Sequence, residues 1–369
     1  MSPAGSAADP APDAVPDSAP RVAVVGSGAW GTTLALIVAR SEPVTLLSHS
    51  PETAARLAET RQNEQRLPGV ELPVRVQVSA DPEVLRSATD LVMFAVPSAY
   101  LRKTVERVAG AVPASADVLS LVKGLENETL LRMTEVIADA SVGTAAPIGP
   151  SRIAALSGPN LAQEIARGLP ASAVVASTDP ALGDRIVARL SRRRFRLYTN
   201  PDVLGVELCG ALKNIVAIAA GAADGLGFGD NGKAGLMTRG LAEMTRLGIA
   251  AGANPLTFAG LAGIGDVIAT CGSKLSRNHR LGEELAKGRP WSEIEASLPG
   301  VAEGAYTVDA ALALAARHGV EMPIAQEVHN ALFEGKSVQR CLVDLLSRES
   351  KDELADFQRW VESLGAARD

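Results

Sequence analysis

Two lysines in the sequence have surroundings that could give them a chemical role. Lys213 lies in the stretch ALKNIVAI, with apolar residues on both sides for a full helical turn. Lysine is rarely buried without a partner, and burial lowers the pKa of its ammonium toward the range in which it exchanges protons near neutral pH. Lys213 is therefore a candidate general acid and base. The alternative is a lysine that extends its side chain from a helix end into solvent.

The second lysine, Lys123, follows a predicted strand in the sequence LVKGLE. It would stand at the carboxyl end of that strand, where α/β sheets bind ligands. Only 8 of the 36 basic residues are lysines, so lysine at both places indicates a need for a compact ammonium. The segment SGPN, residues 157–160, also follows a predicted strand and offers backbone donors together with the Asn160 amide.

Further polar groups occur in the second half of the chain. Asp266 follows a glycine-rich turn in GIGDV. Ser276, Arg277 and Asn278 place a hydroxyl, a guanidinium and an amide side by side, which suits the oxygens of a phosphate. Ser276 and Asp266 could each instead be a helix cap. The joint occurrence of these groups behind a dinucleotide-binding pattern favours a phosphorylated ligand.

Three glycines form that dinucleotide-binding pattern near the start of the chain. Gly26, Gly28 and Gly31 match G-x-G-x-x-G where the predicted strand RVAVV passes into a predicted helix. The first glycine permits the tight turn, the second lets the backbone approach a pyrophosphate, and the third packs helix on strand. The phosphates would lie at the positive end of the helix. Three glycines in a plain loop are the alternative.

The end of the second predicted strand bears on the choice between NAD and NADP. It reads Leu47-Ser48-His49-Ser50 and lacks the Asp or Glu that would hold the ribose 2′-hydroxyl of NAD. Without that carboxylate there is no repulsion against a 2′-phosphate. We therefore expect NADP to be accepted, with Ser48 and His49 as candidate donors. The alternative for His49 is an ordinary surface histidine.

The order of predicted elements indicates two domains, as the length of 369 residues also suggests. Residues 1–20 are rich in Ala, Pro and Asp and are predicted to be a disordered tail. Residues 21–199 are predicted to be an α/β dinucleotide-binding domain of the Rossmann type, with a doubly wound parallel sheet. Its predicted strands are 21–25, 44–47, 91–96, 118–122, 153–157 and 173–176, and its predicted helices include 51–60, 98–110 and 127–140.

Beyond Asn200-Pro201 the β-branched runs stop and segments rich in Ala, Leu and Gly begin. Residues 200–369 are therefore predicted to be an all-helical substrate and catalytic domain. The segment 206–224 is apolar nearly all round, which indicates a helix buried on most sides. The predicted helices are 203–222, 233–252, 255–269, 280–288, 306–318, 323–335 and 350–364.

The composition argues against several classes of partner. The formal charge is −6 and aromatic residues make up 3% of the chain, which argues against nucleic acid. Cys209, Cys271 and Cys341 are far apart, which fits a reducing compartment and neither a disulfide framework nor a zinc cluster. The sequence shows neither a targeting segment nor a long uninterrupted apolar run. We expect a cytoplasmic protein without membrane insertion.

Longer stretches of the sequence resemble the bacterial-type NAD(P)-dependent glycerol-3-phosphate dehydrogenase family. They include GSGAWGT, LVKGLE, LSGPNLAQEIA, the block 200–244, GLAGIGDVIATC, SRNHRLG and VAEGAYT. The block 200–244 is the most specific of them. The resemblance implies NADP(H) or NAD(H) as cofactor and no metal. It also implies reversible reduction of dihydroxyacetone phosphate to sn-glycerol 3-phosphate, a precursor of glycerophospholipids, and a homodimer is one option for the assembly.

The resemblance also implies roles for individual residues. Lys213 would donate and accept the proton, with Lys123 and Asp266 in support. The residues implied in binding the phosphorylated substrate are Lys123, Gly158, Asn160, Lys213, Asp266, Ser276, Arg277 and Asn278. Those implied in binding the cofactor, beside the three glycines, are Ala29, Trp30, His49, Lys123, Ala162, Arg277, Val301 and Glu303.

Two other functions fit parts of the same pattern. A β-hydroxyacid or ketopantoate-type dehydrogenase shares the plan of a Rossmann domain followed by helices. The set of Lys213, Asp266 and residues 276–278 favours a phosphorylated substrate over a carboxylate. A non-catalytic nucleotide sensor would bind the cofactor without turnover, and Lys213 argues against it.

Overall fold

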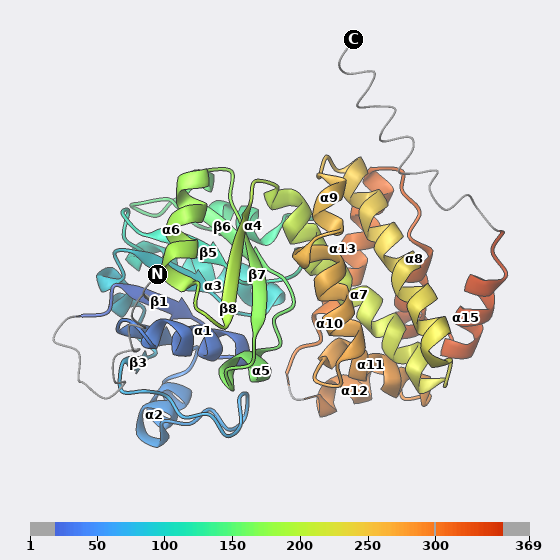
Figure 1. The fold of residues 1–369 in the computed structure, drawn as a ribbon, viewed down its shortest axis with the longest axis horizontal. Coiled ribbons are helices and arrows are strands. Elements are labelled where there is room, and N and C mark those ends of the chain that lie inside the picture. The colour runs from blue at the N-terminus through green and yellow to red at the C-terminus, as the bar shows by residue number, and fades with distance from the viewer. Residues whose placement is uncertain (1–18, 299, 350–369) are drawn as a thin grey trace, which may run out of the picture. The chain divides into compact units, whose positions relative to one another are not determined.

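A computed structural model describes residues 19–298 and 300–349, which divide into two compact units (Figure 1). The first unit runs to Val203, except for the short segment Gly124–Arg132, which belongs to the second unit. The second unit continues from Leu204. Most of the predicted tail, 1–20, and the whole of the predicted helix 350–364 lie outside the described residues.

The first unit is built on one sheet of eight strands in the order β3-β2-β1-β4-β5-β6-β7-β8. The predicted doubly wound α/β fold is confirmed, with one correction. Neighbouring strands are parallel except β6 and β7, which are antiparallel, so the sheet is mixed. The strands are β1 Val22–Val25, β2 Val44–Leu47, β3 Val76–Ser79, β4 Leu91–Phe94, β5 Asp117–Ser120, β6 Ile153–Ser157, β7 Ala171–Ala176 and β8 Phe195–Asn200.

Six α-helices accompany this sheet in the described part of the first unit. They are α1 Ala29–Ala39, α2 Pro51–Thr60, α3 Leu101–Val108, α4 Met133–Ala140, α5 Ala162–Ala166 and α6 Pro180–Leu190. The prediction of a helix over 127–140 is wrong in its first part. The chain folds back there, with Leu125 and Arg132 paired in an antiparallel bridge, and α4 begins only at Met133.

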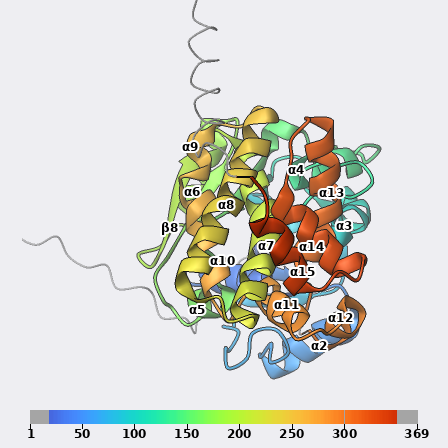
Figure 2. The ribbon, with the colours of Figure 1, turned by 90° about the vertical axis from the view of Figure 1, so that its right-hand side faces the viewer.

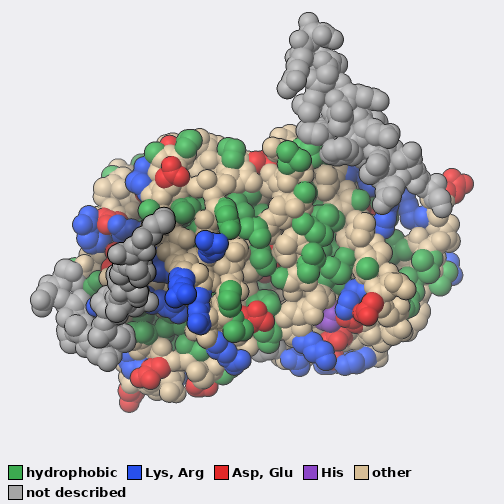
Figure 3. All heavy atoms as spheres, viewed as in Figure 1, with side chains coloured by type: hydrophobic (Ala, Val, Ile, Leu, Met, Phe, Trp, Pro, Cys, Tyr) green, Lys and Arg blue, Asp and Glu red, His purple; other side chains and the backbone are tan. Residues whose placement is uncertain are grey.

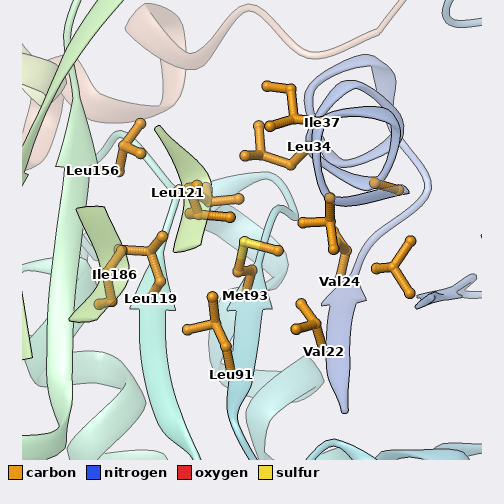
Figure 4. Packing of buried hydrophobic residues seen from close by; sticks show 14 of the residues in the cluster. Val22, Val24, Leu34, Ile37, Leu91, Met93, Leu119, Leu121, Leu156 and Ile186 are labelled. Carbon is orange, nitrogen blue, oxygen red and sulfur yellow. The ribbon is translucent and has the colours of Figure 1, made fainter. Parts of the chain in front are cut away.

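The central strands consist of nearly uninterrupted runs of apolar residues, because helices cover both faces of the sheet there. All four residues of β1, of β2 and of β4 are buried. Alternate residues of a strand share a face. Figure 4 shows Val22 and Val24 of β1 beside Leu91 and Met93 of β4, on the side of the sheet where Leu34 of α1 packs. Burial on both faces is typical of strands in a parallel sheet between two helical layers.

The two edge strands, β3 and β8, are not predicted from the sequence. In β8, Phe195 and Leu197 are buried while Arg196 and Tyr198 are exposed. In β3 only Val76 is buried. An edge strand that faces water on one side needs polar residues, so it lacks the apolar run by which the central strands are recognised.

The second unit is helical in its described part, as predicted. Its helices are α7 Val203–Gly225, α8 Gly229–Ala250, α9 Pro255–Phe258, α10 Asp266–Gly272, α11 Arg277–Ala286, α12 Trp291–Ser297, α13 Glu303–Arg317, α14 Pro323–Phe333 and α15 Val338–Leu346. The predicted helix 255–269 is wrong as a single element, because a π turn, Leu261–Gly265, separates α9 from α10. Helices α12 and α15 are not predicted from the sequence.

Helix α7 forms the core of the second unit. Its buried residues come from all sides of the helix and include Leu208, Leu212 and Ile215. Helix α11 touches it backbone to backbone, since a Cβ at Gly282 would lie 1.9 Å from the carbonyl oxygen of Ile218. By length and hydropathy both α7 and the stretch Pro255–Gly272 could cross a membrane. However, 83% of the apolar window of α7 is buried inside the protein, as in the core helix of a globular unit.

Glu243 of α8 anchors the start of α14. Its carboxylate accepts hydrogen bonds from the backbone N–H groups of Ile324 at 2.8 Å and Ala325 at 3.4 Å. The first N–H groups of a helix have no acceptor within the helix, so this side chain from a neighbouring helix satisfies them. Burial raises the pKa of Glu243 to about 7, although both hydrogen bonds oppose the rise.

We expect Glu243→Gln to change how stability depends on pH. A carboxyl whose pKa is raised from 4.5 to about 7 on folding favours the folded state most below pH 4.5, and this contribution is lost as the pH rises toward 7. Glutamine stays neutral and still offers an acceptor oxygen. Relative to wild type, the variant should therefore gain up to about 3 kcal/mol of unfolding free energy between about pH 5 and pH 8. Denaturant midpoints of both proteins across this range measure the difference, and a constant difference would contradict the prediction.

Candidate active site

The glycine turn between β1 and α1 has the shape of a phosphate cradle. Gly26 has a φ of +116°, and a Cβ there would lie 2.5 Å from the carbonyl oxygen of Ala95. A Cβ at Gly31 would lie 1.9 Å from the carbonyl oxygen of Gly26, so only glycine lets α1 start this close to the turn. At Gly28, in contrast, a Cβ would meet nothing within 4 Å. The backbone at Gly28 is therefore open to a ligand.

Helix α1 presents its first backbone amides to that opening. Gly28 is the N-cap and makes no side-chain capping bond, and the first turn carries no acidic residue. Free amides and the helix dipole favour an anion there. Ala29 and Trp30 open the helix, and in the described part of the chain the buried indole nitrogen of Trp30 has no hydrogen-bond partner. These features fit the pyrophosphate of a dinucleotide.

The end of β2 offers one accessible candidate donor for a 2′-phosphate instead of two. Ser48 is 1% exposed, and its hydroxyl accepts a hydrogen bond from the Ser27 hydroxyl at 3.0 Å. Ser48 thus belongs to the packing beneath the glycine turn. His49 is exposed, as a residue that reaches a bound nucleotide must be.

Lys123 and Gly158 lie at the ends of neighbouring strands. Strands β5 and β6 are parallel and adjacent, Lys123 follows β5, and Gly158 follows β6. The ammonium of Lys123 donates a hydrogen bond to the carbonyl oxygen of Gly158 at 2.9 Å. This bond holds the ammonium at the carboxyl edge of the sheet, which is the edge where α/β sheets bind ligands.

Asn160 has hydrogen-bonding capacity that the protein does not use. Within residues 19–298 and 300–349, its Oδ1 and Nδ2 atoms and the Ser157 hydroxyl are buried without a hydrogen-bond partner. Buried polar atoms are rarely left unpaired, so these atoms indicate a ligand. Ala162 connects this segment to α1, since its carbonyl oxygen accepts a hydrogen bond from Thr33 at 3.2 Å.

In the second unit, Lys213, Thr270 and Asp266 form one buried hydrogen-bonded group, called here the lysine group. The Lys213 ammonium donates to Thr270 Oγ1 at 2.7 Å and lies 3.1 Å from Asp266 Oδ1. Thr270 donates in turn to the same Asp266 oxygen at 2.9 Å. Lys213 is 7% and Asp266 1% exposed, so Lys213 does not extend into solvent. Asp266 is not a helix cap either, because the N-cap of α10 is Gly265.

Two helices position the lysine group. Lys213 lies in the middle of the buried α7, while Asp266 and Thr270 are four residues apart on one side of α10. The π turn Leu261–Gly265 ends where α10 begins, and π turns are frequent at functional sites. Sequence reasoning missed Thr270. The signal that could have found it is its i+4 spacing from Asp266.

The polar residues at the start of α11 have partly structural roles. Asn278 Nδ2 donates to Asn214 Oδ1 at 2.8 Å, and Asn278 Oδ1 accepts from the Gly304 N–H at 2.9 Å. Asn278 thereby ties α11 to α7 and α13, which leaves one amide hydrogen for a ligand. Ser276 caps α11 by accepting a hydrogen bond from the His279 N–H at 3.2 Å, so the capping alternative is confirmed for Ser276.

Arg277 is the first residue of α11 and is exposed. A guanidinium at a helix N-terminus favours a phosphate through both its charge and the adjacent helix amides. Glu303 is the first residue of α13, and Val301 lies partly exposed two residues before it. Of the residues proposed for the cofactor, Arg277, Val301 and Glu303 thus belong to the second unit, and the others belong to the first.

Across the described ranges 19–298 and 300–349, there is no cluster of three or more His, Cys, Asp or Glu residues that could hold a metal ion. Burial raises the pKa of the Cys271 thiol, one residue after Thr270, to about 12. Such a thiol is inert near neutral pH.

A phosphate cradle at the switch point of a doubly wound sheet, followed by a helical unit with a buried lysine, defines an NAD(P)-dependent dehydrogenase. The chain belongs to the NAD-dependent glycerol-3-phosphate dehydrogenase family. The N-terminal part of the family matches residues 21–183, and the C-terminal part matches residues 202–343.

Close relatives match almost the whole chain. The glycerol-3-phosphate dehydrogenase (NAD(P)+) of Chlorobium limicola is 44% identical over 334 residues, which cover 90% of this chain and 99% of the relative. The enzyme of the same name from Streptomyces griseus is 46% identical over 335 residues, covering 90% and 98%. The chain is therefore similar to these enzymes along their full length.

Solved structures agree with that membership. The crystal structure of glycerol-3-phosphate dehydrogenase from Coxiella burnetii is similar with a TM-score of 0.83 and 36% identity, covering 89% of this chain and 98% of that one. A ketopantoate reductase family protein from Ralstonia eutropha has a TM-score of 0.55 at 18% identity, covering 88% and 99%. The second likeness concerns the fold alone.

We expect Gly28→Ala to weaken cofactor binding without changing stability. A methyl group at this position meets no protein atom within 4 Å, and the φ of −70° suits alanine. It would stand where the backbone approaches the pyrophosphate, so the Kd for NADPH should rise about tenfold or more. Gly149→Ala is a matched control, because Gly149 is also an extended N-cap residue with nothing within 4 Å. Titration of both variants with NADPH checks this, and equal affinities would contradict it.

Proposed function

We propose that this chain catalyses the reversible NAD(P)-dependent reduction of dihydroxyacetone phosphate to sn-glycerol 3-phosphate, with Lys213 as proton donor and acceptor. The observation that carries the role of Lys213 is its burial together with a carboxylate at 3.1 Å and a hydroxyl at 2.7 Å. Family membership supports the substrate and the reaction.

Lys213 handles the proton that the reaction requires. A nicotinamide cofactor, when bound, would supply the hydride. As C2 of the ketone is reduced, negative charge develops on its oxygen, and the Lys213 ammonium stabilises that charge and donates a proton from Nζ. In the direction of alcohol oxidation, the neutral amine takes the proton back.

Asp266 and Thr270 keep the ammonium ready for this step. Asp266 supplies the opposite charge that a buried ammonium requires. Thr270 Oγ1 accepts one Nζ hydrogen and so fixes the directions of the other two. Both residues are positioning residues, because they act through Lys213.

The remaining residues bind the phosphorylated substrate. Arg277 binds it at the N-terminus of α11, with Asn278 in support. Binding energy from a group remote from C2 orients the reacting carbon, which raises the rate of the chemical step. Lys123 adds a positive charge, and the unpartnered Asn160 amide offers hydrogen bonds to the bound molecules.

The cofactor is held by the first unit at the cradle of Gly26, Gly28 and Gly31. The absence of a carboxylate at the end of β2 and the exposed His49 favour acceptance of NADPH. A preference for NADPH over NADH stays a prediction, as do the cytoplasmic location and the homodimer.

We expect Lys213→Ala to slow turnover by about 10²-fold or more, because the reaction loses its proton donor. Cofactor affinity should stay nearly unchanged, since the phosphate cradle belongs to the first unit. The loss of nicotinamide absorbance with dihydroxyacetone phosphate measures turnover, with NADPH and NADH compared side by side. Lys287→Ala is a control, because it removes an exposed lysine that follows α11 and pairs with Glu284 in the last turn of that helix.

Each competing function gives a different result in this assay. Normal turnover by Lys213→Ala would assign the proton to another group. Oxidation of NADPH by wild type with ketopantoate but not with dihydroxyacetone phosphate would favour a ketopantoate-type enzyme. Cofactor binding with no turnover on any of these ketones would favour a nucleotide sensor.

A further inference from the structure

The second unit contains a large apolar groove that the proposed reaction does not use. It has a volume of about 760 Å³. Ile218 and Ala222 of α7 line its floor together with Leu226, which follows α7, while Leu236 of α8 lines one wall and Val328 of α14 lines the other. Figure 2 shows α7 between α8 on one side and α14 with α15 on the other. The groove is thus bordered by four helices of one unit.

The groove continues into exposed apolar surface. Leu346, at the end of α15, is 75% exposed, and Phe228, just before α8, is 37% exposed, and both line the groove. Hydrophobic side chains reach the surface at many places in Figure 3, so one exposed leucine means little by itself. A continuous apolar groove with an apolar rim, in contrast, is typical of a binding surface.

The sequence that follows the groove has the pattern of a helix that fits it. Ser350 and Glu353 match the S-x-x-E sequence pattern of a capping box, and Gly365 is of a type that commonly ends a helix. At 100° per residue, the large apolar residues between them fall within one third of the helix circumference. They are Leu354, Phe357, Trp360, Val361 and Leu364. A helix over 351–364 would be about 21 Å long and apolar on one side only.

We propose that residues 350–364 form an amphipathic helix whose apolar face binds in the groove of the same chain. The connection favours this occupant, because Arg348 and Glu349 line the groove and the helix would start at the next residue. A tethered segment binds at a high effective concentration, whereas a second copy or a separate partner has to be collected from solution. The match to the C-terminal part of the family ends at residue 343.

Charged residues at the groove are compatible with a helix whose apolar face binds there. Arg239 and Arg246 of α8 line the groove, while Asp356 would flank one edge of the apolar stripe. Opposite charges at the rim of an interface select the register of a docked helix more than they add affinity. The apolar stripe supplies the main part of the binding energy.

Hydrogen exchange followed by mass spectrometry on the full chain tests the proposal. The amides of 351–364 should exchange at least about tenfold more slowly than those of an unstructured peptide. Phe357→Ser with Trp360→Ser should abolish this protection and also speed exchange in α15. Arg359→Ala with Ser363→Ala, on the opposite side of the helix, is the matched control and should leave the protection intact.

A substitution in the groove itself tests the same proposal without changing the sequence of residues 350–364. Gly235 of α8 lines the groove, and a Cβ there would meet nothing within 4 Å, so a larger residue leaves the unit folded. Gly235→Glu should abolish protection of 351–364, whereas Gly235→Ala should keep it. Fast exchange of 351–364 in wild type, or protection that Gly235→Glu does not change, would overturn the proposal. If the chain is a dimer and the protection is lost on dilution, the groove binds a second copy of the chain. That result would overturn the proposal as well. None of these readouts depends on turnover.

Discussion

The buried ammonium of Lys213 is the constraint on which the second unit depends. A charge in the interior of a protein is strongly unfavourable unless an opposite charge and hydrogen bonds compensate it. Asp266 and Thr270 provide that compensation within 3.1 Å of Nζ. A buried ion pair adds little net stability, yet removal of one partner leaves the other uncompensated. The Lys213–Asp266 pair is thus better explained by a role in proton transfer than by a contribution to the stability of the second unit.

Asn214, the residue after Lys213, places a similar constraint on how the helices of the second unit pack. Asn214 follows Lys213 on a helix that is buried nearly all round, so both polar side chains need partners from other helices. Helix α10 supplies Thr270 and Asp266 to Lys213, and α11 supplies Asn278 to Asn214. Two adjacent polar residues on α7 therefore determine which helices must pack against it and in which register.

The sequence predicts those features whose surroundings are formed by residues that are neighbours along the chain. The glycine turn and Lys213 can be predicted because neighbouring residues reveal their surroundings, namely a strand before the turn and apolar residues around the lysine. Thr270 cannot be predicted with equal ease, since its role arises only when α10 packs beside α7. Ser48 is similar, because nothing near it in the sequence shows that its hydroxyl pairs with Ser27. Strand β8 escapes prediction because an edge strand alternates between buried and exposed residues.

The pH dependence of ketone reduction in Asp266→Asn tests the central claim most directly. At high pH the rate falls when the proton donor is no longer protonated. An ammonium that loses its carboxylate partner gives up its proton more readily, so we predict that this alkaline limb of kcat moves to lower pH by about one unit or more. Cofactor affinity should stay close to that of wild type. An alkaline limb at the same pH as in wild type would contradict the pairing of Asp266 with the proton donor.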